Sequence, residues 1–524
     1  MCEQVPKKFS SDVYHHPRWK LDWGSTSFTL LGIVFSVDLD QIVDLNYSTK
    51  IPTIHAMIKQ WSRRILTPIG RVTVVKTLLL PKLIHLISSL PNPSQGMITS
   101  LTQELFRFMW KSKCDKVKRV IVTQKYFRGG LNMTNINNFI LSIKSSWIKK
   151  VVSCNQSWLG IFKASYGEEV VKKILDFGDE YISYLLKNTF NPFWTDVFSS
   201  WLKVVHLQLT SNSQMQGKLL DIPVWYNSKI KVGKTHVFLK KWYEKGVKTF
   251  NDFVDSNGNF LTLDEFKQIF NLDHVCYMQY NGIINSISTL VKKLNVSKEL
   301  RKHANGPSIP FHYRDILLRK KCTNHIYNFI NIQEEIPTSI VKWKSSNLLS
   351  GCKDIITKEI FEICFKLTAD SAAQWLQYRI LHRIIPVKSY LKKIKILDND
   401  ICSFCENGSE TIEHVFVSCD KILTLWNQLS MHIYRKTKSR IGFNVFNIIF
   451  GDCPLLDSNK VINFIILYTK QYIYLCCKQN RSPSFEGVLQ YLKLKYEIDH
   501  CLSLSNCNFT RFSTMWAAWK NIFE

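Results

Sequence analysis

The sequence predicts a mainly α-helical, multi-domain protein with minor β structure and one small Cys3His zinc segment. The chain has 524 residues, of which 45% are hydrophobic and 13% aromatic, so it can bury several cores. Apolar residues recur at helical spacing along much of the chain. Three cysteines and one histidine also stand close together with the spacing of a metal site. These three observations give the predicted fold class.

The first predicted helix covers residues 53–66 and is basic and amphipathic. Its apolar residues follow the i, i+3, i+4, i+7 pattern and are Ile54, Met57, Ile58, Trp61 and Ile65. Lys59, Arg63 and Arg64 lie off this apolar stripe. The helix therefore presents a cationic face opposite its buried face.

Two more helices are expected after a break at residues 67–70 (TPIG). An apolar stretch from Arg71 to Leu80 runs into Pro81, which lacks a backbone donor and should kink or end the helix. A third helix is expected over residues 97–111, where Ile98, Leu101, Leu105 and Phe108 share one face.

The minor β structure is expected at residues 120–123, before a turn at Arg128-Gly129-Gly130. Residues 303–310 concentrate turn-forming residues and are a candidate linker. Residues 360–384 are expected to form one helix. The apolar run at 461–477 contains Asn463, Lys470 and Gln471, so it predicts a buried helix and not a membrane span.

The charge of the chain favours a polyanionic partner. Lys and Arg total 69 against 41 acidic residues, a net charge of +28. Residues 51–150 hold 17 Lys and Arg but only two acidic residues, Glu104 and Asp115, which gives +15 of that total. A second stretch, residues 371–397, has six Lys and Arg and no acidic residue.

An excess of Lys and Arg over acidic residues, with aromatic residues between them, is typical of a surface that follows a nucleic-acid backbone. A solvated basic face is the alternative, although such faces usually carry both signs. The expected nucleic-acid contacts are Lys59, Arg63, Arg64, Arg71, Lys76, Lys82, Lys111, Lys113, Lys116, Lys118, Arg119 and Arg128.

The candidate metal ligands are Cys402, Cys405, His414 and Cys419, in the pattern C-x2-C-x8-H-x4-C. Three thiolates and one imidazole complete a tetrahedral site, so the expected cofactor is structural Zn²⁺ and not a catalytic ion. The alternative is a pair of buried free thiols and an unrelated surface histidine. A redox role is disfavoured, because no thioredoxin-type strand-helix unit surrounds the cysteines.

Polymerase chemistry requires closely placed carboxylates that hold two metal ions. The sequence has no Asp-Asp pair, so no catalytic residue is assigned.

Fifteen cysteines are too few for a disulfide scaffold, and residues 1–16 contain no apolar signal stretch. We therefore expect an intracellular location, in the nucleus or the cytoplasm, without membrane insertion.

Several motifs resemble LINE-type non-long-terminal-repeat retrotransposon reverse transcriptases. They are WGSTSFTLLGIVFS at 23–36, WSRRILTPIGRVTVVKTLLLPKLIHLISSLP at 61–91, FRFMWKSKCDKVKR with the later RGGL, and YRILHRIIPVKSYL followed by CSFC, ETIEH and VSC. The resemblance is patchy between about 140 and 215 but spans most of the chain.

The resemblance implies a domain order that begins downstream of the catalytic aspartates. Residues 1–36 would be the end of the polymerase palm, 37–150 a thumb-like basic helical domain and 151–302 a helical post-polymerase region. After the linker at 303–310, residues 311–400 would be a helical connection, 401–420 the zinc-binding segment and 421–524 a C-terminal helical domain. The chain alone would then be no enzyme, but a fragment of an RNA-directed DNA polymerase.

The expected partner is RNA or an RNA–DNA hybrid, with the element's own transcript as the candidate. An upstream polymerase core, in cis or in trans, would be a second partner. Three other interpretations stay open at this point: a co-opted host nucleic-acid-binding protein, a scaffold whose basic faces dock proteins, and the product of a pseudogene.

Overall fold

The computed structural model describes residues 15–16, 19–20, 27–38, 40–153, 156–210, 220, 222–293, 319–331, 335–346, 358–452, 457–507 and 509–523. The predicted linker at 303–310 lies outside these residues. The chain forms two compact units, each assembled from separated stretches. The first comprises Met1–Met57, Leu79–Thr102 and Asn135–Ile332, and the second comprises Ile58–Leu78, Gln103–Thr134 and Gln333–Glu524.

A short hairpin, in which β3 (Ser27–Leu30) pairs antiparallel with β4 (Ile33–Ser36), precedes helix α1 (Gln41–Ser62), which begins in the first unit and ends in the second. Asn46 ties this helix to the hairpin. Its Oδ1 accepts from the Val34 amide at 2.9 Å and its Nδ2 donates to the Val34 carbonyl at 2.7 Å. This anchor supports a helix that starts well before the predicted residue 53 and continues through a proline.

The other helices of the first unit are α3 (Pro81–Ser89), α6 (Ile136–Ser145), α7 (Trp147–Ser153), α8 (Trp158–Tyr166), α9 (Val170–Asp176), α10 (Asp179–Lys187), α11 (Pro192–Thr210), α12 (Lys240–Glu244), η5 (Phe250–Phe253), α13 (Leu263–Phe270), α14 (Tyr277–Lys293) and α16 (Cys322–Ile330). Its remaining strands are β1 (His15–His16), β2 (Trp19–Lys20), β5 (Lys231–Val232) and β6 (Thr235–His236). Two apolar clusters support this unit, one around Trp201 and one around Trp225.

The second unit contains α2 (Pro68–Val74), η2 (Val75–Leu79), α5 (Arg119–Thr123), η3 (Tyr126–Arg128), α17 (Thr338–Lys344), η8 (Lys358–Phe361), α18 (Ile363–Leu367), α19 (Ser371–Leu381), α20 (Lys388–Lys393), η9 (His414–Ser418), α21 (Asp420–Thr437), α22 (Val445–Phe450), α23 (Asp457–Lys478), α24 (Phe485–Ser505), α25 (Phe509–Trp516) and η10 (Ala517–Phe523). Helix α4 (Gln95–Met109) begins in the first unit and ends in the second. The prediction of a helix at 97–111 is confirmed.

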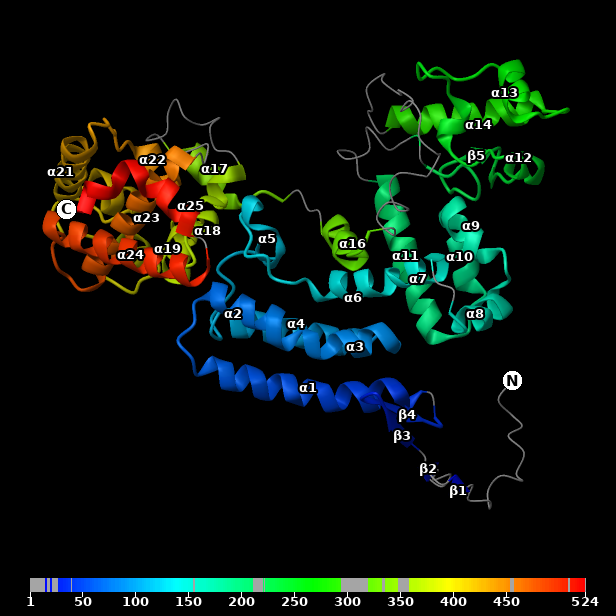
Figure 1. Cartoon of the computed structure of the whole chain (residues 1–524), viewed down its shortest axis with the longest axis horizontal. Helices are drawn as coiled ribbons and strands as arrows, with labels where there is room; N and C mark the ends of the chain where they lie inside the picture. The colour runs from blue at the N-terminus through cyan, green and yellow to red at the C-terminus, as the bar shows by residue number, and fades with distance from the viewer. Residues whose placement is uncertain are drawn as a thin grey trace. The chain divides into compact units, whose positions relative to one another are not determined.

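Helix α23 forms the centre of the C-terminal core. It contacts α18, α19, α24 and α25, which surround it in Figure 1. Phe464, Ile465 and Ile466 are almost fully buried, which confirms the buried helix predicted at 461–477. Lys470 is also buried, and its Nζ donates to Gln377 Oε1 at 2.6 Å. The Lys470 side chain in this apolar helix is therefore hydrogen-bonded inside the core.

The prediction of a strand at 120–123 is wrong, because these residues belong to the short helix α5. A β-branched run forms a strand only where another strand can pair with it. Here the amides of Leu131 and Met133 both donate to the carbonyl of Val122. The local backbone bonds are satisfied without a sheet.

The single helix predicted at 360–384 is interrupted and divides into η8, α18 and α19. Asp370 causes the second break, because its Oδ1 accepts from the Ala372 amide at 2.9 Å and so caps a new helix. The Thr368 hydroxyl accepts in turn from the Asp370 amide at 3.0 Å. These side chains compete with the backbone for hydrogen bonds.

Among the described residues, no single helix is both long and apolar enough to cross a membrane. One bent pair, Pro68–Leu79 with Pro81–Ser89, meets that length and composition only when the two helices are counted together.

Candidate metal centre

A tight loop positions the first two cysteines. Its ends meet at the bridge between Ile401 and Ser409, and the Cys402 amide donates to the Gly408 carbonyl at 3.0 Å. Gly408 has a φ of +80°, a backbone conformation that glycine adopts without strain. The loop therefore brings Cys402 and Cys405 onto the same side.

A wide helical turn positions the other two ligands. His414 begins the π-helix η9, and the Cys419 amide closes this turn on the His414 carbonyl at 3.0 Å. Such turns are frequent at functional sites. Cys419 is also the residue before α21, where the amide dipoles of the helix favour a thiolate.

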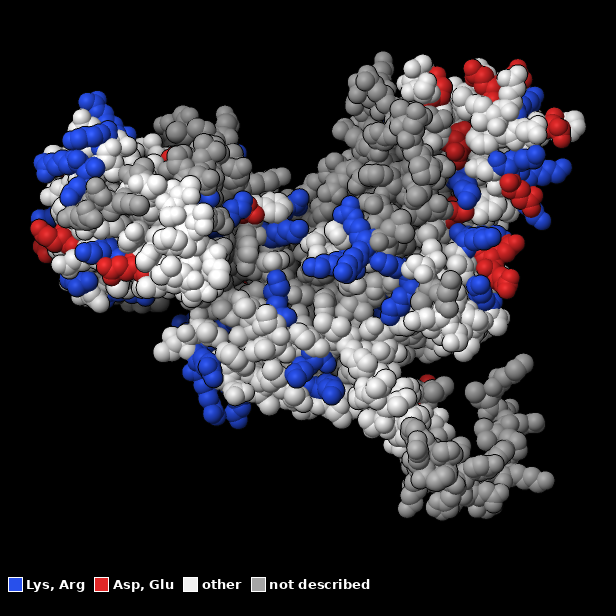
Figure 2. Space-filling view, viewed as in Figure 1, with Lys and Arg blue, Asp and Glu red and all other residues white. Residues whose placement is uncertain are grey.

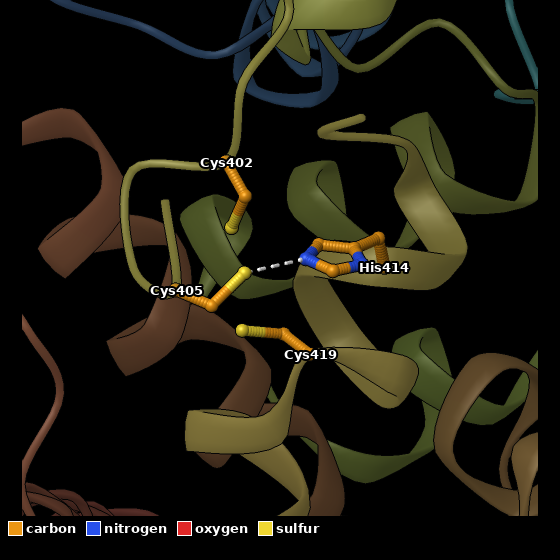
Figure 3. A group of neighbouring side chains, drawn as sticks. All are labelled: Cys402, Cys405, His414 and Cys419. Carbon is orange, nitrogen blue, oxygen red and sulfur yellow. Dashed lines mark hydrogen bonds between the residues drawn. The ribbon is translucent and has the colours of Figure 1, made fainter. Parts of the chain in front are cut away.

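The four donor atoms converge on one small volume, as Figure 3 shows. Their Sγ and ring nitrogen atoms all lie within 4.8 Å of one another, and Cys405 Sγ is 3.3 Å from His414 Nε2. Zn–S bonds of about 2.3 Å in a tetrahedron place sulfur atoms roughly 3.8 Å apart. The cluster therefore fits a zinc ion after a small contraction, and the sequence prediction of these ligands agrees with the geometry.

Burial and mutual repulsion act on the thiols of this cluster. Burial raises the pKa of Cys402, the backbone amides of Phe404 and Cys405 partly oppose this shift, and the Cys405 thiol adds to it. Burial likewise raises the pKa of Cys419 to about 12, with contributions from Cys402 and Cys405. A divalent cation among these sulfurs compensates both effects, because it stabilises the thiolates directly. Ligand deprotonation and metal binding are thus coupled.

A buried carboxylate that lies outside the predicted ligand set holds the cysteine loop in place. Glu410 is 2% exposed. Its Oε2 accepts from the Ser403 hydroxyl at 3.1 Å, and its Oε1 accepts from the Lys388 amide at 3.0 Å. Lys388 Nζ lies 4.0 Å from the same carboxylate. Because Ser403 lies between Cys402 and Cys405, Glu410 fixes the loop that carries both ligands.

The comparison with protein families matches this region. Residues 346–426 match the zf-RVT family, described as zinc-binding in reverse transcriptase. The Cys3His cluster lies within the match. This stretch is a reverse transcriptase-related zinc segment. It contains a cluster of side chains that can hold zinc. The described residues of the chain are mostly helical, as the sequence predicted.

The residues predicted to contact nucleic acid have different environments. Nine are exposed in the second unit, namely Lys59, Arg63, Arg64, Lys76, Lys111, Lys113, Lys116, Lys118 and Arg119. Arg128 is half-buried in that unit, and Lys82 is exposed in the first unit. Two of the nine are paired with acidic residues, because Lys118 contacts Glu335 and Arg119 lies 2.7 Å from Asp115.

Arg71 differs from the other predicted contacts because it is only 3% exposed. Its Nη1 donates to the Phe108 carbonyl at 2.7 Å, and its Nη2 to the Ser62 carbonyl at 3.4 Å. The guanidinium therefore joins the ends of α1 and α4 inside the second unit. A phosphate cannot reach it in this structure, so we assign Arg71 a structural role.

Proposed function

We propose that this chain binds RNA or an RNA–DNA hybrid, as the nucleic-acid-holding part of a LINE-type non-long-terminal-repeat reverse transcriptase. Zinc has a structural role in this proposal, and no catalytic step is assigned to the chain. The matched zinc segment supports the reverse-transcriptase context. The exposed cations of the second unit support the choice of a polyanionic partner.

One observation carries the proposal: the cationic segments from the first quarter of the chain fold into the same compact unit as the zinc segment. Tyr126 stacks on Phe365 with ring centroids 3.8 Å apart. His382 Nε2 lies 2.8 Å from the Gly129 carbonyl oxygen. A zinc segment of reverse-transcriptase type and a cationic surface thus form one folded body.

The sign of the surface charge is consistent with this proposal. In the view of Figure 2, the patches of Lys and Arg over the C-terminal half of α1 have no Asp or Glu among them, whereas both signs appear over α24. Arg64 lies over the Trp61 ring at 4.7 Å, so the guanidinium is held at the surface by an aromatic side chain. Such cations can replace the counterions of a phosphate backbone.

The test is the salt dependence of binding by the full chain. We expect the affinity for a labelled RNA–DNA hybrid, measured by fluorescence anisotropy, to fall steeply as salt concentration rises. The triple change Lys59→Glu, Arg63→Glu and Arg64→Glu should lower the affinity at least about tenfold and reduce the slope of log K against log salt by roughly 2 to 3.

The control is a matched charge reversal in the first unit. Lys229, Lys231 and Lys234 are exposed lysines around the β5–β6 hairpin, and changing all three to Glu alters the net charge equally. Binding by this variant should stay close to that of the wild type. Affinity that does not depend on salt, or equal losses in both variants, would contradict the proposal.

A further inference from the structure

A groove of about 460 Å³ opens in the second unit beside the N-terminus of α19. The α1–α2 loop, the end of α4, the segment after α4 and α19 all contribute to its wall. Its lining residues include Leu66, Trp110, Lys111, Lys113, Lys116 and Trp375. Its volume lies within the range of small-ligand sites, roughly 300 to 1,000 Å³.

The indole of Trp375 is held in place at this groove and remains partly exposed. It packs against Trp110 at a centroid distance of 6.1 Å and stacks on the buried Tyr378 at 5.4 Å with an interplanar angle of 19°. Neighbouring rings therefore fix its orientation before any ligand arrives. A fixed aromatic surface of this kind can stack any nucleobase, whatever the sequence of the strand.

Among the residues that the structure describes, three lysines and no acidic residue line the groove. The pKa of Lys116 is lowered by burial, and also by the charges of Lys113 and Arg379. Arg379 lies over the Trp375 ring at 5.8 Å. These cations repel one another in the free protein, and an anion among them would remove that repulsion.

The acidic residues nearest to the groove in sequence are already engaged. Asp115 pairs with Arg119 at 2.7 Å, and Asp370 pairs with Lys495 at 2.7 Å and also caps α19. Neither carboxylate therefore competes freely for the three lysines. The cationic character of the groove persists in the folded chain.

Trp110, which lines the groove, carries a buried donor. Trp110 is 4% exposed, and its indole N–H finds no acceptor among the residues that the structure describes. Buried donors without a partner are uncommon in folded proteins and are often satisfied by a ligand or a water molecule.

We propose that this groove accepts an unpaired nucleotide of a single-stranded segment, with its base against Trp375 and the flanking phosphates on Lys111, Lys113 and Lys116. The inference rests on the proposed function and makes it specific, because it assigns a separate site to the unpaired strand beside a duplex. Stacking needs an exposed base face, which a base within a duplex does not offer.

The experiment compares two labelled ligands on the full chain: a blunt RNA–DNA hybrid, and the same hybrid with a single-stranded extension. Wild-type protein should bind the extended hybrid more tightly. Trp375→Ala should lose roughly tenfold affinity for the extended hybrid, the range for stacking one base, and keep its affinity for the blunt hybrid. Trp375→Phe should restore most of the difference.

The matched control is Trp158→Ala, which removes a partly exposed tryptophan from an aromatic cluster of the first unit. Photo-crosslinking of an extension that contains 4-thiouridine should label the peptide with Trp375. Circular dichroism and zinc content of Trp375→Ala should match those of the wild type, which separates loss of the groove from misfolding.

The outcomes distinguish the two proposals. If neither the wild type nor any variant binds either hybrid, the proposed function fails. If both hybrids bind with equal affinity to wild type and to Trp375→Ala, only the groove proposal is overturned. A third result would assign the groove to a protein partner. In that case a peptide of alternating Glu and Tyr binds the wild type but not Trp375→Ala, and the binding of both hybrids is the same in the two proteins.

Discussion

At the scale of single residues, His382 joins two distant parts of the second unit. Its Nε2 lies 2.8 Å from the Gly129 carbonyl, so this nitrogen must carry the proton and donate it. The ring also packs against Tyr378 at 4.2 Å and Phe361 at 5.6 Å. Burial lowers the pKa of His382 to about 4, and the bond to Gly129 only partly opposes that shift.

This histidine should make the stability of the second unit depend on pH. An unfolded histidine has a pKa of about 6.5, so between that value and about 4 the unfolded chain binds the proton more strongly. The free energy of unfolding should therefore fall as pH drops through this window, by up to about 2 kcal/mol at pH 5 from this group.

His382→Gln is the variant that tests this prediction. Its amide can still donate to the Gly129 carbonyl but does not titrate. Urea unfolding of wild type and variant at pH 7 and pH 5 should show a smaller loss of stability in the variant. Equal losses would mean that His382 does not titrate as the burial implies. Other titrating groups, the zinc ligands included, cancel in the comparison.

At the scale of elements, the turn at residues 128–130 depends on two adjacent glycines. Gly129 has a φ of +80°, and a Cβ there would lie 2.8 Å from Pro337 Cγ. A Cβ on Gly130 would lie 1.9 Å from the Gln124 carbonyl oxygen, which is backbone and cannot move aside cheaply. Close backbone approach, more than flexibility, therefore requires glycine at position 130.

Gly130→Ala should destabilise the second unit by about 3 kcal/mol or more, because the turn must open to admit the methyl group. Gly96→Ala is the control. Gly96 lies in the first turn of α4, and apart from its chain neighbours and its own helix backbone no described atom lies within 4 Å of the position that a methyl group would take there, so this change should be neutral or stabilise by up to about 1 kcal/mol. Thermal unfolding of both variants measures the contrast, and similar melting temperatures would contradict it.

The elements that the sequence predicted are those whose signals are local. Apolar spacing found α4 and α23, and the spacing of Cys402, Cys405, His414 and Cys419 found the metal centre, because all four ligands belong to one short segment. The break at Asp370 was missed, since its capping role is visible only once α19 has a defined start.

Contacts between residues far apart in the sequence, and the burial that results from them, could not be predicted in the same way. Trp110 and Trp375 lie 265 positions apart in number (375 − 110) and meet only through tertiary packing. Burial likewise removes Arg71 from the predicted cationic surface, although the sequence grouped it with Arg63 and Arg64 as a cation of the same basic region. Composition shows that a basic surface exists, whereas packing decides which cations are on it.

At the scale of the whole molecule, the zinc segment should stabilise one unit and leave the other unaffected. The cluster residues Cys402 and Cys419 belong to the apolar core of the second unit, together with residues of α21 and α23. Metal binding energy is folding energy where ligands converge only in the folded state. Loss of the ion should therefore loosen the loop at 401–419 first and weaken the helices packed on it.

We expect purified wild-type protein to carry one zinc ion per chain by atomic emission. Removal with a strong chelator should lower amide exchange protection at residues 401–419 by at least about 100-fold, or about 3 kcal/mol, while α10 and α11 of the first unit keep theirs. Cys405→Ser should reproduce the effect without chelator, and the exposed Cys501→Ser should not. Protein that purifies without zinc, or equal metal content in the two variants, would show that these ligands do not hold the ion.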